Sequence, residues 1–168
     1  MAELQLRKIT LGICKAGRND PLQEIAPSLP ANTLAVSTDK SAKELQRMGL
    51  DMERLIWVDA TGKIYWRAAP QKDFSNWFFT EGPTALAHLS TVVAAKSAAG
   101  HVKFVALCKI NPLLEQNGLE KTEDFLRYLA LKFRSLGIGF LVIADDSAGV
   151  RRLRRSLPGV FDSKITLS

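Results

Sequence analysis

Short apolar runs recur along the chain, and polar stretches separate them. Because these runs are largely apolar rather than strictly alternating with polar residues, they predict β-strands that are buried on both faces of a sheet. Such runs occupy residues 8–14, 33–37, 55–59, 102–108 and 140–144, and a shorter one occupies residues 164–167.

The segments between these runs carry helix signals. Pro21 suits the first turn of a short helix, Ser41 and Glu44 form a capping box, and Gly49 and Gly137 suit helix ends. Strands that alternate with helices predict an α/β fold of three layers, in which helices flank a mostly parallel sheet. The longer helices are expected over residues 83–98, 122–136 and 148–157.

Composition narrows the class of protein. The chain has 168 residues, of which 46% are hydrophobic and 24% charged, and this predicts one globular domain over residues 1–168. We expect no membrane association, because no apolar stretch approaches the roughly 18 residues that a span needs. Cys14 and Cys108 lie in apolar runs, which indicates buried thiols in a reducing cytoplasm and neither a disulfide nor a metal site.

Ligands of a parallel α/β sheet bind beyond the carboxyl ends of its strands, so the turn after the first strand is a candidate nucleotide site. A phosphate-binding loop needs several glycines, followed by lysine and serine or threonine where the helix begins. Here Asn19 and Asp20 stand at the helix start, and the carboxylate of Asp20 would repel phosphate. We therefore expect this degenerate site not to bind nucleotide; its residues are Lys15, Gly17, Arg18, Asn19 and Asp20.

Three aspartates also follow predicted strands. Asp59, Asp145 and Asp146 supply the oxygen ligands that a magnesium ion prefers. A metal-dependent hydrolase that uses Asp145 and Asp146 is accordingly one alternative function. No nucleophile with an adjacent base accompanies these aspartates in the sequence, so we name no catalytic residue and no metal ligand.

Four arginines lie within little more than one turn of the helix expected at residues 148–157. Guanidinium groups bind phosphates in a forked geometry, and the formal net charge of +6 permits an anionic partner. This face is a candidate for anion or nucleic-acid binding, and an ordinary solvated helix face is the alternative. The four residues are Arg151, Arg152, Arg154 and Arg155.

The order of these segments resembles that of the RecA/KaiC/RadA superfamily, and specifically that of degenerate archaeal KaiC-like proteins. Residues 33–61 resemble the family's strand, helix and strand that closes on aspartate, and residues 81–98 resemble the helix that leads into the Walker B strand. Residues 104–144 resemble the Walker B strand, its loop, the long helix and the next strand, and residues 157–167 resemble the closing segment. The resemblance covers nearly the whole chain and implies a RecA-like P-loop NTPase fold.

The chain departs from this family pattern at three places. The Walker A residues are absent from residues 15–20, and Asp39 stands where a catalytic glutamate would follow the second strand. The Walker B strand ends in Cys108 and Lys109 instead of an acid, so Lys109 places a positive charge where the metal belongs. The resemblance therefore implies a RecA-like protein without ATP hydrolysis or cofactor, with an active KaiC-like ATPase as the alternative.

The same resemblance implies a regulatory or assembly role. Because RecA-like domains commonly pack side by side, the expected partner is a second copy or a RecA-like paralogue. We expect the partner surface in residues 61–82, an aromatic-rich insertion or loop without clear periodicity.

Part of this segment also resembles the box through which DNA replication and repair factors bind the sliding clamp (PCNA). Such a box plugs aromatic side chains into an apolar pocket, while its glutamine makes polar contacts. A DNA repair accessory factor is thus a further alternative, and aromatics that tuck a long loop onto the core are the structural one. The four candidate residues are Gln71, Phe74, Trp77 and Phe78.

Overall fold

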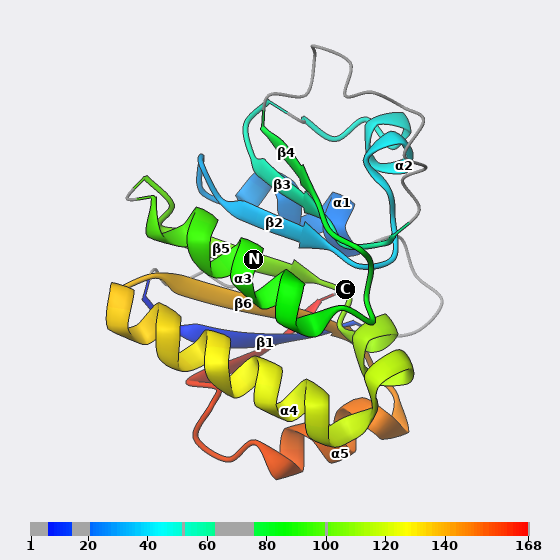
Figure 1. Cartoon of the computed structure of the whole chain (residues 1–168), viewed down its shortest axis with the longest axis vertical. Helices are drawn as coiled ribbons and strands as arrows, with labels where there is room; N and C mark the ends of the chain where they lie inside the picture. Colours follow the sequence, from blue (N-terminus) through cyan, green and yellow to red (C-terminus); the bar gives the residue numbers. More distant parts are fainter. Residues whose placement is uncertain (1–6, 15–20, 52, 63–75, 100, 168) are drawn as a thin grey trace.

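The computed structural model of the chain describes residues 7–14, 21–51, 53–62, 76–99 and 101–167. Seven strands in this part of the chain form one parallel sheet with the order β4-β3-β2-β5-β6-β1-β7 (Figure 1). The strands are β1 (Ile9–Cys14), β2 (Leu34–Ser37), β3 (Ile56–Asp59), β4 (Trp77–Phe79), β5 (Phe104–Cys108), β6 (Gly139–Asp145) and β7 (Ser163–Leu167).

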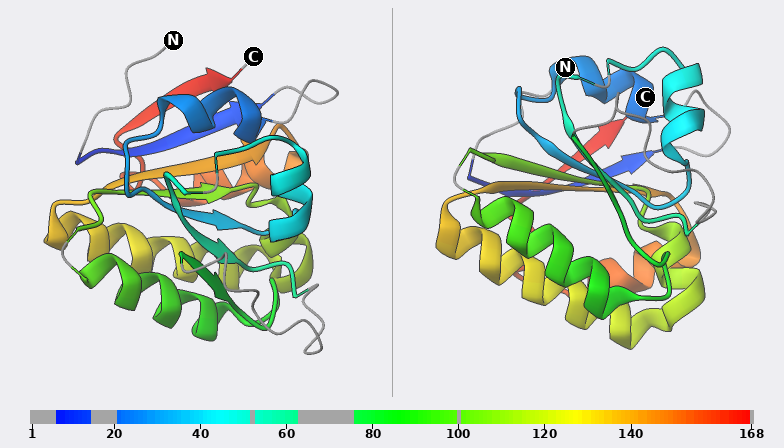
Figure 2. Two further views of the ribbon diagram at one scale, coloured as in Figure 1. Left: turned by 90° about the horizontal axis from the view of Figure 1, so that it is seen from above. Right: turned by 45° about the horizontal axis from the view of Figure 1, so that its top comes forward.

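Helices cover both faces of the sheet (Figure 2). The long helices α3 and α4 and the shorter α5 lie on one face, and the short helices α1 and α2 lie on the other. The predicted three-layer α/β fold with a parallel sheet is therefore confirmed. The helices are α1 (Pro21–Ile25), the 3-10 helix η1 (Ala26–Ser28), α2 (Ala42–Arg47), α3 (Leu86–Ala98), α4 (Asn111–Leu136) and α5 (Ala148–Ser156).

The five strands between the edge strands β4 and β7 are buried along most of their length, yet their side chains alternate between two cores. In β5, Val105 and Leu107 pack into the core under α3, α4 and α5, whereas Phe104 and Ala106 pack into the core under α1 and α2. Both cores are apolar, so the two-residue period of the strand does not appear as alternation between apolar and polar residues.

Several local signals form as expected. The N–H of Ser41 donates to the Glu44 carboxylate at 2.7 Å, which is half of the predicted capping box of α2. Gly137 ends α4 in the left-handed conformation, with φ 66°, as expected of a glycine beyond a helix end.

Three predicted boundaries are wrong. Helix α4 begins at Asn111 instead of residue 122, because Pro112 is tolerated in a first turn, and a kink at Gly118 (φ 79°, ψ 176°) divides it into two helical parts. Helix α3 begins at Leu86 and not at residue 83. Residues 61–82 are not irregular throughout, because Trp77–Phe79 forms strand β4, which pairs in parallel with β3 at the edge of the sheet.

Asp162 ties the beginning of β1 to the segment that enters β7. Its carboxylate accepts the Ile9 N–H at 2.7 Å and the Arg134 guanidinium at 2.8 Å. Burial on its own would raise the pKa of Asp162, but these two donors outweigh it and lower the pKa below its ordinary value. The charged carboxylate therefore favours the folded state.

We expect Asp162→Asn to lower the free energy of unfolding by about 1 kcal/mol near neutral pH, since the group is partly exposed. A lowered pKa contributes stability above the ordinary pKa, and this contribution is lost as pH falls through the folded value. The difference from the unaltered protein, measured in urea titrations, should consequently shrink as the pH is lowered below the ordinary value of 3.8. Asp146→Asn is the matched control, because it removes an exposed ion pair alone; an equal loss in both variants would contradict an added contribution from the charge of Asp162.

Candidate functional site

The carboxyl ends of three adjacent strands bring Asp39, Lys109 and Asp145 together. Strand β5 lies between β2 and β6. Asp39 is the second residue after β2, Lys109 directly follows β5, and Asp145 is the last residue of β6. The Lys109 ammonium lies 3.3 Å from Asp39 Oδ2 and 3.4 Å from Asp145 Oδ2. We call these three residues the Lys109 cluster.

The backbone around Lys109 is held in an uncommon conformation. Lys109 has φ 60°, the left-handed region that non-glycine residues seldom adopt. The Thr38 hydroxyl, which is buried, donates to the carbonyl oxygens of Cys108, at 3.1 Å, and of Lys109. The Ile110 N–H donates to the Ile143 carbonyl at 2.8 Å. These bonds fix the end of β5 against both neighbouring strands and so fix the point from which the lysine side chain leaves.

Hydrogen bonds also fix the carboxyl ends of β6 and β2. Asn111, at the start of α4, accepts the Asp145 N–H at 2.8 Å and donates to the Asp145 carbonyl at 3.3 Å. In the turn after β2, the Ser37 hydroxyl donates to the Lys40 carbonyl at 2.6 Å. Hydrogen bonds among three strands and the long helix thus hold the backbone of the Lys109 cluster in place.

The carboxylates keep Lys109 charged. Partial burial on its own would lower the pKa of Lys109, but Asp39 and Asp145 outweigh burial and raise the pKa above its ordinary value of 10.5. Lys40 places a second ammonium 3.1 Å from Asp39 Oδ2. Two carboxylates and two ammonium groups balance one another, so these four side chains carry no net negative charge that would attract a metal cation.

The three predicted magnesium ligands do not converge. Asp59 accepts the N–H and the hydroxyl of Thr61 at 2.9 and 2.6 Å, Asp145 pairs with Lys109, and Asp146 pairs with Arg151 at 2.9 Å. Among the described residues, no group of three or more histidine, cysteine or acidic side chains could hold a metal ion. Each of the three carboxylates therefore turns to a different partner, and the alternative of a metal-dependent hydrolase that uses Asp145 and Asp146 stays a prediction.

The predicted nucleotide turn, Lys15, Gly17, Arg18, Asn19 and Asp20, lies outside the described residues. Its two flanks are described: β1 ends at Cys14, whose carbonyl accepts the Asp146 N–H at 2.9 Å, and α1 begins at Pro21. The turn therefore starts from the same edge of the sheet as the Lys109 cluster.

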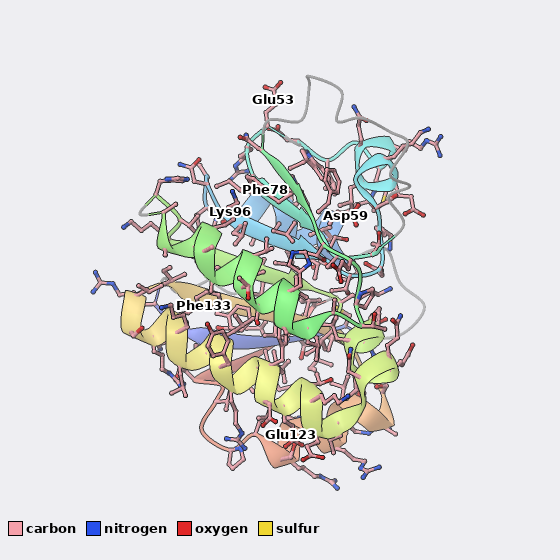
Figure 3. All side chains as sticks on the ribbon, in the orientation of Figure 1. Glu53, Asp59, Phe78, Lys96, Glu123 and Phe133 are labelled. Carbon is pink, nitrogen blue, oxygen red and sulfur yellow. The ribbon has the colours of Figure 1, made fainter. Side chains whose placement is uncertain are left out.

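The aromatic residues of β4 pack inward. Trp77 is only 6% exposed, and its ring stacks on Trp57 with 5.5 Å between centroids. Phe78 is half-buried, and the Lys96 ammonium lies 3.6 Å from its ring centroid (Figure 3). Gln71 and Phe74 lie outside the described residues. The burial of Trp77 in the core on the α1 and α2 side of the sheet agrees with the structural alternative for this residue, and partner binding by the segment stays a prediction.

The arginines of α5 form an exposed face, as expected. The side chains of Arg151, Arg152, Arg154 and Arg155 are all exposed, while Val150 and Leu153 bury the opposite side of the helix. Arg151 is held by Asp146, which leaves three arginines of this face without an ion pair among the described residues. Anion or nucleic-acid binding by this face stays a prediction.

Sequence reasoning identified Lys109 but missed its pairing with Asp39 and Asp145, and it missed the role of Thr38. One signal was available: all of these residues follow buried strands of one parallel sheet, so their side chains meet at one edge.

No protein-family model and no curated protein matches the sequence. Among solved structures, the chain is similar to the crystal structure of a KaiC-like protein from the hyperthermophilic archaeon Pyrococcus horikoshii OT3, with a TM-score of 0.64 and 13% sequence identity. The similarity covers 98% of this chain and 76% of that protein. None of the described helices combines the length and apolar character that crossing a membrane requires. The chain has a KaiC-like fold.

Proposed function

We propose that this chain is a non-catalytic KaiC-like protein that acts as a regulatory or assembly partner through its surface. The observation that carries the proposal is the position of the Lys109 ammonium, between two carboxylates at the carboxyl ends of β2, β5 and β6. Ligands of a parallel α/β sheet bind at that edge, and a P-loop NTPase needs a magnesium ion there, held partly by a carboxylate.

An ammonium group cannot replace that magnesium ion. Lysine offers one charge and hydrogen-bond donors only, whereas magnesium accepts several oxygen ligands at once, including those of the substrate phosphates. Lys109 neutralises Asp39 and Asp145 and repels a divalent cation from the same place. The lack of Walker A residues at 15–20 supports the same conclusion from a second part of the chain.

The proposal is tested by titrating the protein with ATP and magnesium in a calorimeter and measuring phosphate release in parallel. We expect no phosphate release above the buffer blank and no dependence of any weak binding on magnesium. Micromolar, magnesium-dependent binding with turnover that Asp39→Asn abolishes would overturn the proposal and establish the active-ATPase alternative. The Asp39→Asn variant is the matched control, because it removes a carboxylate of the cluster and keeps its shape.

Clamp binding and a role in DNA repair remain the second candidate from the sequence. The burial of Trp77 counts against this candidate, because the box requires its aromatic side chains to be free to enter a pocket of the clamp. A surface that serves an assembly role must therefore be sought elsewhere on the molecule.

A further inference from the structure

The outward face of α4 exposes large apolar side chains. Tyr128 is 49% exposed, Leu131 66% and Leu136 42%, and these are three of the four large hydrophobic residues that the described part of the chain exposes. The opposite face of the helix is core, where Leu126, Leu129 and their neighbours are buried. The packing of α4 against the sheet therefore leaves a large part of each of these three side chains uncovered.

A helix of this kind places residues three and four apart on one face. From Tyr128, one turn back is Asp124, and one turn forward are Leu131 and Lys132; all four are exposed. We call these four residues the α4 face. Asp124 and Lys132 make no side-chain ion pair in the described part of the chain, so both charges are available to a partner.

This arrangement of charges is self-complementary. When two copies of α4 lie antiparallel, with a two-fold axis at Tyr128, Asp124 of each copy faces Lys132 of the other, and Tyr128 and Leu131 meet in the middle. A parallel arrangement would oppose Asp124 to Asp124 and Lys132 to Lys132. A closed two-fold dimer repeats each favourable contact twice, which is why such dimers are the commonest oligomers.

The neighbouring helix leaves this face accessible. Helix α3 runs beside α4 on the same side of the sheet (Figure 1), and three of its exposed residues are small, namely Ala87, Thr91 and Ala95. A second helix that approaches α4 from the α3 side therefore meets small side chains at these three positions. The segment from Thr122 to Leu136 is about 22 Å long at 1.5 Å per residue. A face of that length buries less than the roughly 800 Å² per partner of a standard interface, so the dimer is expected to be weak.

We propose that the α4 face binds the same face of a second copy of this chain in an antiparallel, two-fold arrangement. The proposal rests on the assembly role proposed above and names its partner. Tyr128 and Leu131 supply the apolar centre of the interface, and the two Asp124–Lys132 pairs at its ends fix the register and exclude the parallel arrangement.

The test is sedimentation equilibrium of the full chain over a wide range of concentrations. We expect a monomer–dimer equilibrium in the unaltered protein and at least a tenfold weaker dimer for Leu131→Gln, whose melting temperature should stay unchanged because the residue is exposed. Asp124→Lys alone should weaken the dimer by opposing two positive charges, and the double variant Asp124→Lys, Lys132→Asp should restore it.

A chain that stays monomeric up to about millimolar concentration would overturn the proposal, and so would a dimer that Leu131→Gln and Asp124→Lys leave equally tight. These outcomes are separate from the test of the non-catalytic role. A monomer without ATP turnover contradicts only the α4 face, whereas a dimer with turnover contradicts only the absence of catalysis.

Discussion

Trp77→Ala should lower the free energy of unfolding by about 3–5 kcal/mol, the range for removing a large aromatic side chain from a core. The ring is 6% exposed and stacks on Trp57 at an interplanar angle of 13°, and the chain around it pairs with β3. Truncation would leave a cavity between the edge strand and Trp57 that the rigid sheet cannot close. Urea denaturation followed by circular dichroism measures the loss.

Phe79→Ala is the matched control for this prediction. Phe79 lies in the same edge strand but is 37% exposed, so its truncation should cost much less than that of Trp77. If Trp77→Ala kept its stability but no longer bound a protein partner, Trp77 would be the partner-binding residue that the sequence suggested. The comparison therefore separates a core residue from an interface anchor.

Replacing Lys109 by methionine, which keeps a long unbranched side chain without the charge, should lower the free energy of unfolding by about 1–3 kcal/mol near neutral pH. The variant leaves the Asp39 and Asp145 carboxylates close together without the ammonium that separates them. All three side chains are partly exposed, so the loss should stay below the roughly 3–5 kcal/mol of a fully buried pair. Lys109→Arg, which keeps the charge, should lose less.

The pH dependence of this loss has a definite sign. The pKa of Lys109 is raised above its ordinary value of 10.5 in the folded protein. The ammonium therefore contributes its full stability below that ordinary value, and the contribution is lost as pH rises through the folded pKa. The difference between the protein and Lys109→Met should accordingly shrink above about pH 10.5. A difference that is constant across this range would show that the charge of Lys109 contributes nothing.

Strands and caps could be predicted from the sequence because their signals are local. The apolar run of β6, the Ser41–Glu44 pair and Gly137 each depend on residues within one turn or one strand. Strand β4 could not be predicted in the same way, because three residues have no period of their own and gain their hydrogen bonds only from β3. The sequence alone did not predict helix on both sides of Gly118, because a glycine at that position is typical of a loop.

The contacts within the Lys109 cluster could not be predicted from the sequence either. The resemblance in sequence predicted that Lys109 stands where the Walker B acid of the family would be, because that comparison needs only one position. Which side chains meet the ammonium depends on the strand order, and β2, β5 and β6 become neighbours through crossovers that no local pattern encodes. Asp39 and Asp145 are thus far from Lys109 in sequence and within 3.4 Å of it in space.

We propose that the Lys109 ammonium occupies the place of a divalent cation, and manganese binding tests this claim most directly. Electron paramagnetic resonance titrations would compare the unaltered protein with Lys109→Ala and with the double variant Lys109→Ala, Asp39→Asn. We expect no specific binding by the unaltered protein, an affinity at least tenfold higher once the ammonium is removed, and loss of that gain in the double variant. Manganese binding by the unaltered protein as tight as that of Lys109→Ala would contradict the claim.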